Sequence, residues 1–288
     1  MKNKITIFLG EDSIYTNATG IRQLLTFYYK CKQFNDVTIQ IALDNIGWLD
    51  GNLCAVLGSL LYRLNKENGL SFLLDAKQVA DKCNVLFYNN FLPVELTKGA
   101  KAKASCIPFR AFYVHQKDEF INYLSDELLV HPGMPKFSEE TKDKLIDDLT
   151  EISGNIHKHA ETNDPFFVCG QHYYKNGTVN FTVSDLGEGF FPKVKAAKPE
   201  LIQTDGDAIL WAVQGNSTKK DAPGGQGLKK LRQYFEANGG GMHIFTGANG
   251  WLSEQSESNL YKNGIVPLPN AYNGASINLI FNKKSLVL

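Results

Sequence analysis

The sequence has no excess of charge of one sign, few cysteines and no long apolar run. Its 288 residues include 30 basic and 30 acidic side chains, so no net charge would attract the chain to nucleic acid. No stretch reaches the ~18 apolar residues of a membrane span, and the apolar stretch in residues 1–10 is too short for a signal peptide. These absences predict a cytoplasmic protein that binds neither nucleic acid nor membrane.

The cysteines are odd in number and widely spaced, and no two of them form a CxxC pair. Neither a disulfide framework nor a zinc site is therefore indicated. We expect most of them to be buried as small apolar side chains in a reducing compartment. They are Cys31, Cys54, Cys83, Cys106 and Cys169.

The length of the chain favours two domains, and the first half contains a βαβ pattern. Residues 36–43 alternate like a strand, residues 52–64 form an apolar helical pattern, and residues 70–74 form a second strand. A further strand and helix are expected before a Pro- and Gly-containing break at residues 131–136. We therefore place an N-terminal domain at residues 1–130 and a second domain after it, at 131–288. The further strand and helix cover residues 107–114 and 117–129.

The second half alternates helices with antiparallel strands. A helix is expected over residues 139–160, with Ser138 as its N-cap. Strands over 166–174 and 178–184 are joined across Asn176-Gly177, a strong hairpin signal. This order predicts an α+β fold whose second domain is a two-layer sandwich. The other candidate elements are helices at 206–213 and 228–237 and strands at 242–246 and 275–282.

Three groups of residues in this half could carry chemistry. Glu151, Asn155 and His159 recur at a spacing of four, so one face of the expected helix presents a carboxylate, an amide and an imidazole. Asp185 ends a strand and is followed by two glycines that allow close approach of a ligand. A third group is glycine-rich and opens a helix, whose free N–H groups favour phosphate. It is centred on Gly227.

The order and separation of these groups resemble the GHKL superfamily, which includes gyrase, the heat-shock chaperone ATPases, sensor histidine kinases and anti-sigma-factor kinases. The resemblance covers about residues 138–288. The helix face is similar to the family's N box, and Asp185 with its glycines is similar to the first glycine box. The Gly-rich helix start resembles the second glycine box, and Ser217-Thr218 resembles the stretch that begins the ATP lid.

The resemblance implies a histidine kinase-like (Bergerat) fold that holds Mg·ATP. Asn155 would bind Mg²⁺ through its side-chain oxygen. Asp185 would accept a hydrogen bond from the adenine amino group, and Glu151 would be the general base. Further nucleotide contacts are implied for His159, Gly187, Gly189, Ser217, Thr218, Gly225, Gly227 and Leu228.

One position departs from the family pattern. The final strand of the family carries Gly-Thr, whose hydroxyl supports the adenine site, whereas this chain has Ala275 after Gly274. Ser276 is the candidate that could supply the hydroxyl instead. A transition metal at His157 and His159 is disfavoured, because two ligands fall short of the usual three or four.

Residues 36–74 of the first half resemble a STAS domain, the fold of anti-sigma-factor antagonists. In that family a phosphorylatable Ser follows the Asp of the turn, whereas here Gly51 follows Asp50 and no hydroxyl adjoins it. We therefore expect no phosphorylation at this turn. An ordinary βαβ core explains the same residues, and both interpretations stay open.

Together these patterns predict a Mg·ATP-dependent ATPase with a regulatory or interaction module in residues 1–130 that binds a protein partner. Two alternatives stay open: a protein serine kinase of the anti-sigma-factor type, and a nucleotide-gated interaction switch with negligible turnover. A homodimer is also left open. A fragment starting near Ser138 is expected to retain ATP binding.

Overall fold

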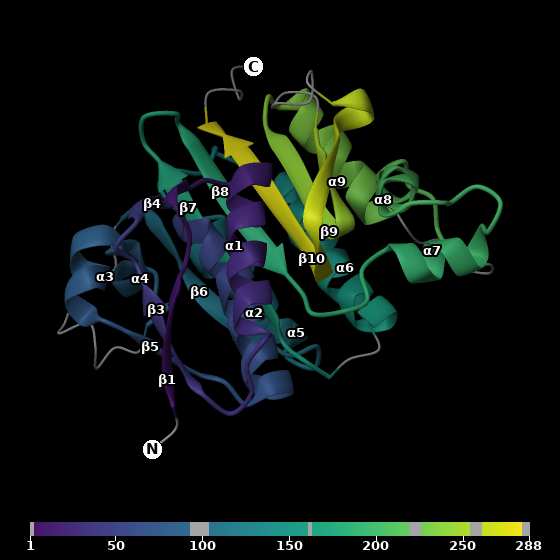
Figure 1. Cartoon of the computed structure of the whole chain (residues 1–288). Helices are drawn as coiled ribbons and strands as arrows, with labels where there is room; N and C mark the ends of the chain where they lie inside the picture. Colours follow the sequence, from purple (N-terminus) through teal and green to yellow (C-terminus); the bar gives the residue numbers. More distant parts are fainter. Residues whose placement is uncertain (1–2, 93–103, 161–162, 219–225, 254–260, 284–288) are drawn as a thin grey trace.

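The computed structural model describes residues 3–92, 104–160, 163–218, 226–253 and 261–283, with the side chains of 153–160 excluded. The chain is a mixed α/β protein whose described strands form open sheets. The coarse prediction of helices combined with antiparallel strands is confirmed. Figure 1 shows the two larger sheets with helices between and beside them.

The smaller of these sheets comes from the first half of the chain. Its strands are β1 (Lys4–Phe8), β3 (Thr38–Ala42) and β5 (Ser71–Leu74), which are parallel in the order β1-β3-β5. Helix α1 (Ala18–Cys31) lies between β1 and β3 in the sequence, and α2 (Cys54–Asn68) links β3 to β5. The predicted βαβ unit is therefore confirmed, and it is extended by β1 and α1, which the periodicity did not indicate.

Local sequence explains where these two helices begin and end. The side chain of Asn17 accepts a hydrogen bond from the Gly20 N–H at 2.9 Å, which is an N-cap for α1. Gly20 is required there, because a side chain would collide with the Tyr15 carbonyl. A 3-10 turn, η1 (Gly51–Leu53), leads into α2, and Gly69 ends α2 in the left-handed region at φ 64°.

The larger sheet has five strands, all paired antiparallel, in the order β6-β7-β8-β10-β9. These are β6 (Cys106–Phe112), β7 (Phe166–Tyr173), β8 (Thr178–Ser184), β9 (Gly241–Leu252) and β10 (Ile265–Asn282). The β7–β8 hairpin predicted from its Asn-Gly turn is present. Strand β6 precedes the expected domain boundary, so the sheet recruits a strand from the first half of the chain.

Helices cover one face of this sheet. They are α5 (Lys117–Tyr123), which continues into the π-helical segment η3 (Leu124–Leu128), together with α6 (Glu139–Ala160), α8 (Asp205–Val213) and α9 (Gln226–Ala237). Helix α6 has the bounds that the sequence predicts. The remaining described elements are β2 (Asp12–Ile14), β4 (Ile46–Leu49), α3 (Ala76–Lys82), α4 (Val85–Tyr88), α7 (Phe191–Ala197) and η5 (Lys262–Gly264).

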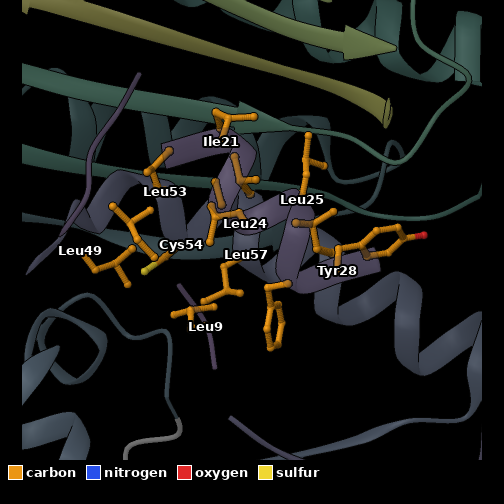
Figure 2. Close-up of a cluster of buried hydrophobic side chains, with 14 of the residues drawn as sticks. Leu9, Ile21, Leu24, Leu25, Tyr28, Leu49, Leu53, Cys54 and Leu57 are labelled. Atoms are coloured by element: carbon orange, nitrogen blue, oxygen red, sulfur yellow. The ribbon is translucent and has the colours of Figure 1, made fainter. Parts of the chain in front are cut away.

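The opposite face of the large sheet is covered by α1 and α2, which lie between the two sheets. Figure 2 shows Leu24 of α1 and Leu57 of α2 in this shared core. Phe245 of β9 and Tyr272 of β10 belong to the same core, so it is continuous across both halves of the chain. The large sheet therefore has helices on both faces, whereas a two-layer sandwich would have them on one.

Candidate functional site

Asp185 lies directly after β8 with its carboxylate buried. Its Oδ1 accepts hydrogen bonds from the backbone N–H of Gly187 at 2.7 Å and of Ala275 at 3.3 Å. Burial raises the pKa of Asp185 to about 6, and these two hydrogen bonds and the charge of Arg63 oppose the rise. The site thus contains a buried carboxyl group whose pKa lies well above that of an ordinary aspartate.

Glycines allow the chain to close around this carboxyl group. Gly274 has φ 119°, and a side chain there would run into the Asp185 carbonyl. Gly189 has φ 76°, and a side chain there would run into the hydroxyl of Thr246. That hydroxyl donates to the Gly274 carbonyl at 2.6 Å. Both the backbone conformation and the lack of space for a side chain therefore require glycine at positions Gly189 and Gly274.

Thr246 also lines the candidate site, and no pattern in the sequence indicates it. It pairs with Ala275 across β9 and β10, so the two residues share a face of the sheet. Ala275 stands where the family pattern has threonine, and Thr246 brings a hydroxyl to the neighbouring strand. Ser276 is buried opposite Phe245, whose ring belongs to the core beside α1 and α2. Neighbouring strand residues alternate in direction, so Ser276 faces away from the Ala275 side.

A second group of predicted residues meets where α6 and α9 pack together. The carboxylate of Glu151 on α6 lies against Gly227 in the first turn of α9. Leu228 follows, partly buried against the core of the large sheet. The first turn of a helix carries unpaired N–H groups and the positive end of the helix dipole. An acid and an anion-favouring helix start therefore lie next to each other.

Hydrogen bonds link the described residues at the end of α8 with the start of α9. The side chain of Gln226 donates to the carbonyl of Gly215 at 3.2 Å, and Asn216 donates to the carbonyl of Trp211 at 2.9 Å. Ser217 and Thr218 follow directly after Asn216 in the sequence. Gly225, predicted to contact phosphate, lies outside the described residues.

The structure places Asn155 and His159 in α6 by their backbone only. Asn155 lies four residues after Glu151, so the helical repeat keeps the two on one side of α6. Their side chains, and that of His157, lie outside the part of the chain that the structure describes. The prediction of Asn155 as the magnesium ligand therefore stays a prediction.

The turn that resembles a STAS phosphorylation turn is packed against the large sheet. The Asp50 carboxylate accepts from the backbone N–H of Thr16 at 2.6 Å and from Trp48 Nε1 at 2.7 Å. Asn52 is fully buried, and its amide donates to the Thr182 hydroxyl at 2.9 Å. The side chains of this turn therefore form polar contacts that link the two halves of the chain. Local sequence did not indicate this role.

No helix among the described residues is both long and apolar enough to cross a membrane. Comparison with known proteins adds no family: no protein-family model matches the chain, and no curated protein matches it.

Proposed function

We propose that this chain binds Mg·ATP in the manner of GHKL proteins and hydrolyses it. The observation that carries the proposal is the buried carboxylate of Asp185, surrounded by glycines and held by two backbone N–H groups. Both N–H groups bond to Oδ1, and the second oxygen of a carboxylate can accept a further hydrogen bond. The amino group of adenine is a donor of suitable chemistry, and a charged acceptor favours adenine over guanine, which presents a carbonyl at that position.

The phosphates would lie toward the first turn of α9, whose backbone N–H groups and positive dipole end favour anions. Glu151, in contact with that turn, is the candidate general base for the attacking water. Asn155, one helical turn further along α6, would hold Mg²⁺ through a hard oxygen ligand. When bound, Mg²⁺ supplies positive charge that neutralises the phosphate oxygens.

In this proposal the first half of the chain is a regulatory or interaction module with a STAS-like core. The whole chain would be located in the cytoplasm. The parallel order of β1, β3 and β5, with α2 as the crossover helix, supports the STAS-like part. Because the Asp50 turn is buried, a protein partner would bind another surface of this half.

The test of turnover uses ATP labelled on its γ-phosphate. An ATPase releases labelled free phosphate, a kinase retains label on protein, and a switch binds ATP without doing either. We expect free phosphate, and Glu151→Gln should lower its release about 10²–10⁴-fold while retaining ATP binding. The matched control is Glu140→Gln, an exposed acid paired with Lys144 on the same helix. Unchanged release in the Glu151 variant would remove it from the mechanism.

The test of base recognition is calorimetry with Mg·ATP and Mg·GTP. ATP should bind more tightly, and Asp185→Asn should cost about 1.5–3 kcal/mol in ATP affinity, the range for hydrogen bonds to charged groups. Asp50→Asn is the control, because Asp50 is also a buried carboxylate with several donors but lies outside the site. Equal affinities for ATP and GTP would contradict the role of Asp185.

A further inference from the structure

Arg63 reaches from α2, in the first half of the chain, to the loop that follows Asp185. One guanidinium nitrogen donates to the carbonyl of Asn273 at 2.5 Å and the other donates to the carbonyl of Leu186. The side chain is only 12% exposed, and its Nε pairs with Glu67 at 3.2 Å. A planar, charged fork thus joins two segments that flank the candidate adenine site.

A second residue of the same helix contacts the residue that precedes Asp185 in the sequence. Ser59 lies four residues before Arg63, so both project from one side of α2. The Ser184 hydroxyl donates to Ser59 Oγ at 2.8 Å and lies 2.6 Å from the Tyr272 hydroxyl. Helix α2 therefore contacts the residue immediately before Asp185 and the residue immediately after it.

The charge of Arg63 also acts on the carboxyl group itself. Burial favours the neutral form of Asp185. The backbone N–H groups of Gly187 and Ala275 oppose this effect, and the guanidinium of Arg63 adds to their opposition. The other titratable groups that face the pair are Glu67, the ion-pair partner, and two tyrosines, Tyr28 on α1 and Tyr272 on β10. Burial raises the pKa of both tyrosines to about 12, so they stay neutral from pH 5 to 8.

We propose that Arg63 is the positioning residue of the nucleotide site, holding the loop after Asp185 and the neighbouring backbone of Asn273 in place. The inference rests on the proposed function, because it concerns the same adenine site. It makes α2 a structural part of nucleotide binding and gives the first half of the chain direct control over affinity. Any displacement of α2 would loosen the Leu186 and Asn273 carbonyls together.

The test compares Arg63→Gln with Arg22→Gln. Arg22, on α1, also donates from the first half to a carbonyl of β10, that of Pro267 at 2.8 Å, but no contact joins it to Asp185. ATP affinity is measured by calorimetry from pH 5.5 to 8. Arg63→Gln should weaken ATP about tenfold at pH 8. It should also move the midpoint of the acid-side loss of affinity upward, because the guanidinium opposes the rise in the pKa of Asp185. Arg22→Gln should change neither.

The terminal phosphate of ATP loses a proton near pH 6 in every sample. Its effect on affinity is therefore the same for all variants and cancels when they are compared. Arg63→Lys keeps the charge but not the fork, so it should restore the midpoint and recover only part of the affinity. It also carries the test if Arg63→Gln does not fold. Absence of ATP binding by the unmodified chain would refute the proposed function. Binding with an unchanged affinity and midpoint in Arg63→Gln would overturn the role of Arg63 alone.

Discussion

The carboxylate of Glu151 lies against the α carbon of Gly227, so that a methyl group added to Gly227 would lie 2.9 Å from Oε2. This contact joins two of the residues that were predicted to lie on the phosphate side of the site. It also explains why the first turn of α9 carries glycine: the space that a side chain needs is filled by the acid.

Gly227→Ala should displace the Glu151 carboxylate and lower ATP turnover about tenfold or more, since a general base acts only when correctly placed. Stability should hold or rise slightly, because the methyl group meets the end of a flexible side chain and alanine favours helix by about 1 kcal/mol over glycine. Steady-state kinetics and thermal unfolding measure the two effects separately.

A double-mutant cycle with Glu151→Gln identifies the cause. If Gly227→Ala acts through Glu151, the second substitution should have little further effect once the first is present. Additive losses in turnover would show that Gly227 acts through the phosphates or the helix instead.

Thr246→Val should lower both stability and ATP affinity. The substitution leaves the buried Gly274 carbonyl without its 2.6 Å donor, which costs about 1–3 kcal/mol in the free energy of unfolding. It also loosens Gly189 and Gly274 around Asp185. Thr246→Ser, which keeps the hydroxyl, should retain most of both. Urea unfolding and calorimetry are the measurements.

Thr182→Val is the matched control for Thr246→Val. Thr182 is a buried hydroxyl of the same sheet, but it bonds to Asn52 and Asn278 on the side of α2. It should lower stability and leave ATP affinity unchanged. A similar loss of affinity in both variants would mean that Thr246 acts only through stability.

His243 should make the folded chain sensitive to acid. Burial lowers its pKa to about 4, and the Thr16 backbone opposes part of this effect, whereas an unfolded histidine titrates near 6.5. The contribution to stability is constant above pH 6.5. Between pH 6.5 and 4 the unfolded chain takes up a proton that the folded chain does not, so the free energy of unfolding falls with acid by about 1.4 kcal/mol per pH unit.

His243→Gln should remove this slope. The comparison is made by urea unfolding of both proteins at several pH values, since His131 and His172, whose pKa values burial also lowers, titrate equally in both. Parallel dependence on pH in the two proteins would show that His243 does not carry the acid sensitivity.

Some elements of the fold could be predicted from local sequence signals. Periodicity gives α6 with its bounds, and Asn176-Gly177 gives the β7–β8 hairpin. Glu151 and Gly227 are in contact, and the sequence groups them only through the resemblance to GHKL proteins. In each case the information lies within a few residues or in motif spacing.

Features that depend on distant pairing were not predictable in the same way. Thr246 could be recognised only from its register opposite Ala275, and Arg63 only from the packing of α2 beside the Asp185 loop. The pairing of β6 with β7 joins segments that are separated in the sequence by α5, η3 and α6. Such contacts are set by the packing of the whole chain, which no short window of sequence contains.

The structure changes the expectation for a fragment that starts at Ser138. Such a fragment lacks β6, an edge strand of the large sheet, and it lacks α1 and α2, which cover one face. Phe167, Phe245 and Tyr272 would become exposed to water, and burying each large side chain contributes about 1.5–3 kcal/mol. Losses of this size are comparable with the whole stability of a domain.

We therefore expect the fragment to aggregate or remain partly unfolded and to lose ATP binding, contrary to the expectation from sequence. Circular dichroism, gel filtration and calorimetry of the fragment measure these outcomes. The control is to express residues 1–137 together with the fragment as separate chains: if lost contacts are the cause, the two pieces should associate and recover ATP binding. A folded, monomeric fragment that binds ATP as tightly as the full chain would show that α2 is not part of the nucleotide site.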